Sequence, residues 1–282
     1  MKTYIIPVDF SETSVHAAEY AARLSKQTDV AKLILLHSYY VSVYQSVLPT
    51  PDMVILTEDD ANEEAAERLK QLEHLRARLF KEVRNGVTIQ VQLSRENLIR
   101  SIIETISAEN ADLVILGSNG TNSESNSHVG INAINISKLS PVPVIVVPPA
   151  CRCEKVKRLV MACDFKKITE TFPLEPLRKL LTRHDVELMV VNIDRQAKHK
   201  HADPQQLAEE SVLHQMLQEY HPKYYYNESD QVISGILDFA KHKNAQMVVA
   251  LPHKYSFFMS LLHNSVSHEL TVHSAVPVLL LK

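Results

Sequence analysis

Short apolar runs alternate with longer amphipathic segments along the chain. Each run has about six apolar residues with little in-out alternation, which is typical of strands buried on both faces of a parallel sheet. In the first half of the chain the runs lie near residues 3–8, 32–37, 88–93, 111–117 and 142–147. The segments between the runs are long enough for helices, so the pattern predicts strands and helices in alternation.

The intervening segments carry apolar residues at helical spacing. Ser11 is placed to cap a first helix that contains four alanines and Leu24. A second helix is predicted from Thr57 to Arg84, where Asn85-Gly86 would end it. Isoleucines at positions 99, 102, 103 and 106 mark a third helix. The elements predict an open, doubly wound α/β sheet in the order β-α-β-α-β-α-β-α-β.

This pattern occurs twice in the chain. Asp9-Phe10 follows the first run, and Asp164-Phe165 follows a matching run 155 residues later. Further along, residues 111–117 match residues 245–251 at an offset of 134. Several matches at only two constant offsets would not arise by chance, so the chain contains an internal repeat. The change of offset makes the second copy 21 residues shorter.

The repeat predicts two homologous domains, residues 1–149 and 154–282, each with a five-stranded, mostly parallel sheet. The last run of each copy, Val142–Val147 and Val276–Leu281, would be an exposed sheet edge in an isolated domain. Pairing the two runs across a pseudo-twofold axis removes both edges. We therefore expect an internal pseudo-dimer, and a homodimer of the whole chain stays open.

Three of the five glycines follow the fourth run of the first copy, as Gly117, Gly120 and Gly130. A glycine at the carboxyl end of a strand lets backbone approach a ligand, and the next helix offers N–H groups and a positive dipole end to phosphate. Asp9 would face the same crevice, because the first and fourth strands are neighbours at the topological switch point. Its carboxylate would bind ribose or base, or act through magnesium. The alternative is that the glycines only shape a loop.

These features together resemble the universal stress protein family, in a tandem form with two domains in one chain. The resemblance rests on residues 7–11, on the run that ends in His37-Ser38, on the G-x2-G-x9-G loop and on residues 141–144. It covers the whole chain, and it implies an adenine nucleotide alpha hydrolase-like fold. It also implies that nucleotide-binding members hold ATP or a related adenine nucleotide in this crevice. A magnesium ion bound with the nucleotide is expected only from the Asp9 carboxylate.

The family's binding residues can be assigned to this chain by matching positions in the motifs. The resemblance assigns adenine and ribose contacts to Pro7, Val8, Asp9 and Ser38. It assigns ribose and phosphate contacts to Gly117, Gly120, Gly130, Ile131 and Asn132.

The loop departs from the family pattern directly after Gly130, where the family has Ser or Thr and this chain has Ile131. A hydrogen bond to a charged phosphate contributes about 1.5–3 kcal/mol, roughly ten- to hundredfold in affinity. Asn132 is the residue whose amide would replace that bond. Residues 121–129 contain no Lys or Arg, so backbone groups and the helix dipole alone would meet the phosphate charge. We expect weak or lost nucleotide binding in the first domain.

The second copy departs further from the pattern. Its residues at the three glycine positions are Leu251, Lys254 and Asn264. The loop therefore lacks the positive-φ conformations and the close backbone approach that glycine allows. We expect the second domain to be a degenerate copy that does not bind ATP and serves as a structural partner.

Charge and composition narrow the function classes. Lys and Arg number 30 against 33 Asp and Glu, and the formal net charge of −3 disfavours a nucleic-acid partner. No apolar run approaches the roughly 18 residues of a membrane-spanning helix, and the N-terminus does not resemble a signal peptide. Three cysteines disfavour a disulfide framework, so we expect a cytoplasmic protein.

We interpret the chain as a non-enzymatic stress-response or signalling module that works through protein partners. The alternative is an ATP sensor that uses its first domain and hydrolyses ATP slowly. An enzyme of related fold, such as a nucleotidyl transferase, would need basic residues on the phosphates, and the loop supplies none. A catalytic triad of Asp9, Ser11 and His37 is disfavoured, because Ser11 is better explained as a helix cap.

Three other features of the sequence are the histidines of the second copy, the cysteines and one inserted segment. Histidines at positions 253, 263, 268 and 273 do not share one helical face, which favours solvated or partner-facing residues over a zinc site. Cys151 and Cys153 lie in the linker with no second thiol pair nearby, so we expect no metal there, and Cys163 should simply be packed. The segment from Tyr39 to Met53 is an apolar insertion absent from the second copy.

Overall fold

The computed structural model describes residues 2–39, 58–118, 131–165, 167–181, 185–194, 204–251 and 274–281. In the first half its elements are β1 (Lys2–Pro7), α1 (Glu12–Leu24), β2 (Val30–Ser38), α3 (Glu58–Leu79), β3 (Thr88–Ser94), α4 (Leu98–Glu109), β4 (Leu113–Gly117), α5 (Ile131–Leu139) and β5 (Val144–Val147). In the second half they are β6 (Arg158–Ala162), α6 (Ile168–Thr171), α7 (Leu174–Leu180), β7 (Glu187–Asp194), α8 (Pro204–Met216), a 3-10 turn (Gln218–Tyr220), β8 (Lys223–Glu228), α9 (Val232–His242), β9 (Met247–Ala250) and β10 (Val278–Leu280). This alternation confirms the predicted α/β class.

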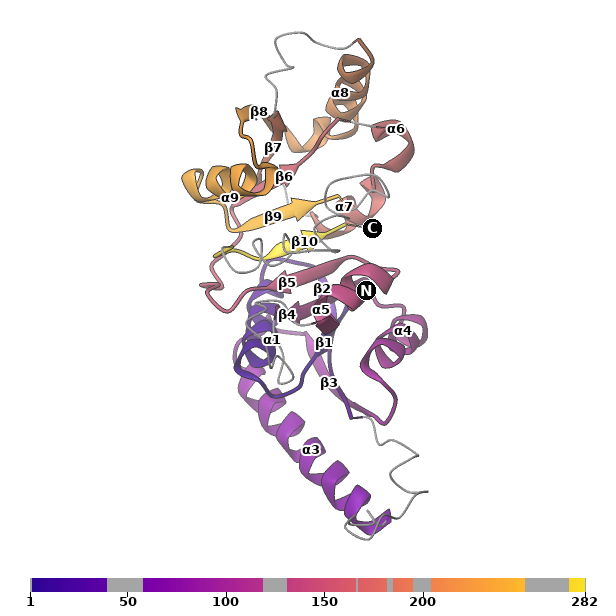
Figure 1. The fold of residues 1–282 in the computed structure, drawn as a ribbon. Helices are drawn as coiled ribbons and strands as arrows, with labels where there is room; N and C mark the ends of the chain where they lie inside the picture. Colours follow the sequence, from indigo (N-terminus) through magenta and orange to yellow (C-terminus); the bar gives the residue numbers. More distant parts are fainter. Residues whose placement is uncertain are drawn as a thin grey trace.

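The strands of the described residues form a single sheet in the order β3-β2-β1-β4-β5-β10-β9-β6-β7-β8. All neighbours are parallel except β5 and β10, which are antiparallel. Ile145 pairs with Leu279 at the centre of that ladder. Figure 1 shows β5 and β10 at the middle of the molecule, with one half of the chain on each side. The predicted pairing of the last strands is confirmed, and each strand covers the other's edge.

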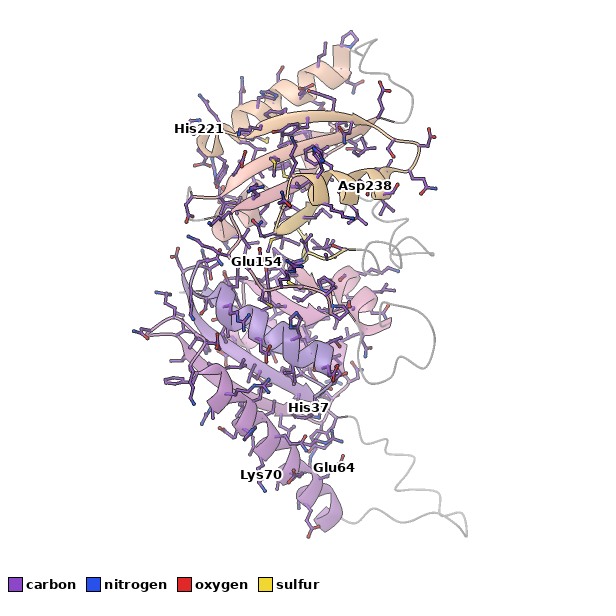
Figure 2. All side chains as sticks on the ribbon, turned by 90° about the vertical axis from the view of Figure 1, so that its left-hand side faces the viewer. His37, Glu64, Lys70, Glu154, His221 and Asp238 are labelled. Carbon is purple, nitrogen blue, oxygen red and sulfur yellow. The ribbon has the colours of Figure 1, made fainter. Side chains whose placement is uncertain are left out.

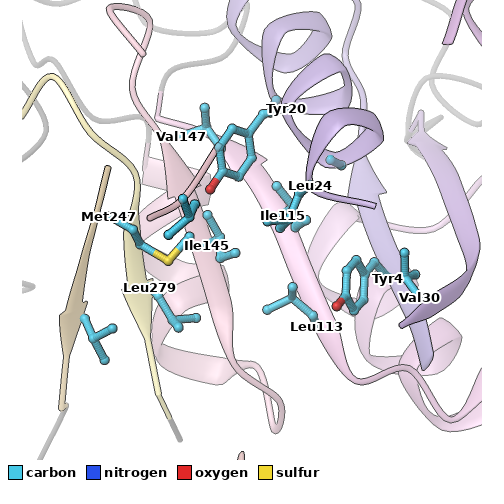
Figure 3. Close-up of a cluster of buried hydrophobic side chains, with 14 of the residues drawn as sticks. Tyr4, Tyr20, Leu24, Val30, Leu113, Ile115, Ile145, Val147, Met247 and Leu279 are labelled. Atoms are coloured by element: carbon cyan, nitrogen blue, oxygen red, sulfur yellow. The ribbon is translucent and has the colours of Figure 1, made fainter. Parts of the chain in front are cut away.

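Helices cover both faces of the sheet, and each face has its own buried apolar cluster. On β1, Tyr4 and Ile6 belong to one cluster and Ile5 to the other, as two-sided burial requires. The cluster that contains Tyr4 continues across the β5–β10 boundary to Met247 and Leu279 (Figure 3). The two halves therefore share a hydrophobic core as well as a sheet.

Matching positions in the two halves adopt matching backbone conformations. Phe10 and Phe165, which are 155 residues apart, have φ values of 63° and 53°. Asn110 and Asn244, which are 134 residues apart, have φ values of 47° and 49°. Positive φ is uncommon outside glycine, so its recurrence at both offsets supports the repeat independently of the apolar pattern.

The helix predicted from Thr57 to Arg84 ends earlier, at Leu79. The N–H of Val83 still donates to the Leu79 carbonyl, but Arg84 is held outside the helix by the first half's other elements. Its N–H donates to Ser25 Oγ at 2.9 Å, and its guanidinium donates to the Val30 carbonyl at 2.8 Å. Tertiary bonds therefore set the end of this helix before Asn85-Gly86 is reached.

None of the helices in the described part of the chain combines the length and the apolar character needed to cross a bilayer. Apart from Tyr39, the predicted insertion lies outside the described residues, and so do the four histidines at positions 253 to 273.

Candidate functional site

The carboxyl ends of three strands meet at one edge of the first half. β1 pairs with β2 on one side and with β4 on the other. Extending these registers places Asp9 level with Ser38, and Val8 level with Gly117. Pro7 ends β1 beside them. The structure therefore brings five of the sequence-predicted site residues together.

The remaining predicted residues follow β4. Helix α5 begins at Ile131, and Asn132 is exposed in its first turn. Gly120 and Gly130 lie outside the described residues.

Asp9 closes the turn between β1 and α1. Its Oδ1 accepts hydrogen bonds from the Ser11 N–H at 3.1 Å and from the Ser11 hydroxyl at 2.6 Å. Ser11 Oγ in turn accepts from the Ser14 N–H at 3.2 Å, which confirms Ser11 as the helix cap. One oxygen of the carboxylate is therefore occupied by local structure.

His37 links the ends of β1 and β2. Its Nδ1 lies 2.6 Å from the Val8 carbonyl, and because a carbonyl only accepts, Nδ1 carries the proton. Burial lowers the pKa of His37, against the opposite effect of the Val8 bond. The centroid of the His37 ring lies 4.7 Å from that of the Phe10 ring. Figure 2 shows His37 on the side of the sheet end where Glu64 of α3 lies. Since His37 bonds to Val8 and Ser11 to Asp9, these residues do not form a catalytic triad.

Ser38 and Val8 are also engaged within the chain. The Ser38 hydroxyl donates to the Glu96 carbonyl at 2.5 Å. The Val8 N–H donates to the Leu36 carbonyl at 2.8 Å. The polar groups assigned to adenine and ribose thus already have intramolecular partners, which leaves a ligand only their spare lone pairs.

Gly117 is required by the packing of α1. A Cβ at this position would lie 2.6 Å from the Thr13 carbonyl oxygen and 2.8 Å from its carbon. These are backbone atoms in the first turn of α1, so the neighbour that approaches closely is a helix of this chain. The close packing of α1 therefore accounts for a glycine at position 117 without a ligand.

The second half keeps part of this arrangement. Asn192, which matches His37, donates from Nδ2 to the Cys163 carbonyl at 2.9 Å, just as His37 bonds to Val8. Leu251 stands at the Gly117 position and is buried. Lys254 and Asn264 lie outside the described residues.

The sequence predicts no metal at Cys151 and Cys153, and it does not indicate that His16 lies beside them, away from this edge. His16, Cys151 and Cys153 bring their ligand atoms within 4.8 Å of one another. His16 and Cys153 are 137 residues apart, and spacing along the chain carries no signal for such a contact.

Comparison with known families agrees with the fold and the repeat. The model of the universal stress protein family matches residues 1–148 and again residues 156–282. The chain belongs to the universal stress protein family. A universal stress protein of Methanocaldococcus jannaschii is 27% identical over 146 residues, which is 52% of this chain and 81% of that protein.

Solved structures extend the likeness to the tandem arrangement. A universal stress protein from Archaeoglobus fulgidus covers 99% of this chain and 96% of its own, with 18% identity and a TM-score of 0.66. At that identity the match shows the fold. A universal stress protein solved in complex with cAMP matches 52% of this chain and 96% of its own, with 19% identity and a TM-score of 0.38.

Proposed function

We propose that this universal stress protein is a non-enzymatic, cytoplasmic stress-response module whose first half binds adenine nucleotide weakly or not at all. Its two halves act as one rigid pseudo-dimer that presents surfaces to protein partners. Nucleic acid and membrane are not among the proposed partners.

The observation that carries the proposal is the engagement of the strand-end polar groups. Asp9 closes the β1–α1 turn, and Ser38 donates to Glu96. At the other side of the crevice, α5 begins with Ile131 in place of a hydroxyl residue. A nucleotide would therefore find few polar groups without an intramolecular hydrogen bond. Residues 121–129 also contain no Lys or Arg that could bind its phosphates.

An ATP sensor is the second candidate. It is favoured by the placement of β1 beside β4, which puts Asp9 near the carboxyl end of β4 and at the switch point where doubly wound sheets bind ligands. If a nucleotide binds here, the carboxylate of Asp9 is the group that would reach ribose or a companion magnesium ion.

Calorimetric titration of ATP with Mg²⁺ into nucleotide-stripped protein separates the two candidates. The wild type should show weak or undetectable heat. Ile131→Ser restores the hydroxyl and should bind roughly ten- to hundredfold more tightly than the wild type. Leu139→Ser is the matched control, because it makes the same kind of change at an exposed residue at the other end of α5.

Micromolar binding by the wild type that Ile131→Ser leaves unchanged would favour the sensor. Release of phosphate faster than the spontaneous hydrolysis of ATP without protein would contradict the non-enzymatic proposal. Gly117→Val is not a suitable probe of binding, since its side chain would collide with the Thr13 backbone.

A further inference from the structure

The linker between the halves runs back along α1. The Val156 N–H donates to Gln27 Oε1 at 2.9 Å, just beyond the C-terminal end of that helix. Near the other end, Cys153 Sγ lies 3.6 Å from His16 Nε2. Cys151 and Cys153 are both buried, while the His16 side chain is 24% exposed. Two thiols and an imidazole therefore converge at the junction between the halves.

The spacing of these atoms suits a metal ion. In a tetrahedral zinc site, sulfur at about 2.3 Å and nitrogen at about 2.0 Å from the metal lie about 3.5 Å apart. The Cys153–His16 separation is 3.6 Å, and all three ligand atoms lie within 4.8 Å of one another. Small side-chain rotations would bring the three ligand atoms to coordinating distance.

The surroundings orient each ligand. The Cys153 N–H points to Cys151 Sγ at 3.3 Å, in a turn where Cys153 has a φ of 51°. His16 Nδ1 lies 4.0 Å from a Glu19 carboxylate oxygen, while Nε2 faces the thiol. A separation of 4.0 Å is too long for a hydrogen bond, so Glu19 would have to move closer on metal binding to hold the ring N–H and direct the other nitrogen to the metal. Arg78 holds the other Glu19 oxygen at 3.0 Å.

A buried hydroxyl on the same helix face has no partner among the described residues. Tyr20 follows His16 by one helical turn, so the two share a face of α1. Burial raises the pKa of the Tyr20 hydroxyl, and the thiols of Cys151 and Cys153 add to that rise. That hydroxyl is left without a hydrogen bond. A water or hydroxide in a fourth coordination position would give it one.

We propose that His16, Cys151 and Cys153 bind one Zn²⁺ ion with two thiolates, one imidazole and an open fourth position. The ion would tie the linker to α1 and so fix the connection between the halves. Two thiolates and an imidazole are ligands that zinc prefers, and three protein ligands leave the fourth position to solvent. Glu19 is a positioning residue that acts through His16.

Cobalt titration tests the site, because thiolate-to-Co²⁺ charge transfer absorbs in the near ultraviolet and histidines elsewhere do not produce it. Reduced, metal-stripped full-length protein is titrated with Co²⁺ under anaerobic conditions, and then with Zn²⁺. The wild type should gain the absorption with one Co²⁺ per chain, and one equivalent of Zn²⁺ should remove it. Metal-dependent thermal stabilisation should accompany the binding.

Four variants sharpen the result. His16→Gln and Cys153→Ser should weaken binding by more than about a hundredfold, and Glu19→Gln by about tenfold. Cys163→Ser is the matched control, since Cys163 is a buried thiol outside the cluster and its loss should leave the absorption unchanged. His16→Gln changes a partly exposed residue and keeps both thiols, so it tests the site even if Cys153→Ser folds poorly.

Three outcomes would overturn the proposal. The first is zinc binding by the wild type without thiolate absorption, which would place the ion on other histidines. The second is an absorption that His16→Gln leaves at full strength. The third is a Cys151–Cys153 disulfide that persists in the stripped protein under mild reductant and excludes the metal.

Discussion

The crevices of the two halves begin from the same sheet and differ in the residue that follows or ends the fourth strand of each half. In the first half Gly117 ends β4, and the backbone of α1 lies where a side chain would be. In the second half Leu251 follows β9, and its buried side chain belongs to the same apolar cluster as Phe165 and Ile168. A buried side chain therefore stands in the second half where the first half needs a glycine.

The first helix of each half also differs, because it is continuous in the first half and broken in the second. α1 is a continuous helix of 13 residues capped by Ser11. Its counterpart is split into α6, of four residues, and α7, of seven, with Pro173 between them. Proline removes a backbone donor and clashes with the preceding turn, so a continuous helix cannot form across this position. The repeat thus keeps its strands and a helix start at the matching position, Ile168, but that start has no side-chain cap and the helix is broken after one turn.

The largest effect should come from removing the buried side chain at position 251, which matches Gly117 of the first half. Leu251→Ala should cost about 2–5 kcal/mol of unfolding free energy, because it leaves a cavity in the core. Urea denaturation followed by circular dichroism measures the loss. Leu207→Ala, at an exposed position of the same half, is the control and should change stability by less than about 0.5 kcal/mol. Equal effects of the two substitutions would contradict the assigned packing.

A side chain at Gly117 should cost somewhat less. Gly117→Ala should destabilise by about 1–3 kcal/mol, because its Cβ meets backbone atoms of Thr13 that cannot move aside. At Gly235 the nearest atoms are side chains of Ser229 and Ile193, which can shift. Gly235→Ala should therefore cost less, or be offset by the helix propensity of alanine. The same urea experiment ranks the two variants, and the reverse order would refute this explanation of Gly117.

The hydrogen bond between the ends of β1 and β2 comes from His37 in the first half, and its counterpart in the second half comes from Asn192. His37→Ala leaves the buried Val8 carbonyl without its donor and should cost about 1–3 kcal/mol. His37→Asn copies the Asn192 arrangement of the second half and should cost less at pH 7. Thermal unfolding of both variants checks this. A similar loss in both would mean that the imidazole contributes mainly by packing.

The smallest effect should be a difference in pH dependence. The folded-state pKa of His37 is lowered by burial, so below about pH 6.5 the unfolded chain takes up a proton that the folded chain does not. The wild type should lose stability as the pH falls from about 6.5 toward the folded pKa. His37→Asn lacks this component, so the stability gap between the two proteins should change in favour of the variant over that range. Parallel pH profiles would contradict the assignment.

The fold was predictable because its signals are periodic and occur twice. Buried runs, the Ser11 cap and the pairing of the last strands all follow from patterns that local chemistry imposes. The contacts that the sequence did not reveal are non-local. Arg84 is drawn away from α3 by Ser25 and Val30, and no spacing rule anticipates such a bond.

The candidate site was predicted in position more than in detail. Strand order alone places Asp9 near Gly117, but the sequence does not say that Asp9 is bonded to Ser11, or that Gly117 accommodates Thr13. The same limit explains why His16 was overlooked beside the linker thiols. Side-chain partners across 137 residues become visible only when the chain is folded.

Hydrogen–deuterium exchange of Ile131→Ser with and without saturating ATP and Mg²⁺ tests the central claim that only the first half retains a nucleotide framework. We expect added protection in peptides that cover residues 8–14 and the end of β4. The matching peptides, residues 163–169 and the end of β9, should not change. Protection in the second half, or in neither half, would contradict the account.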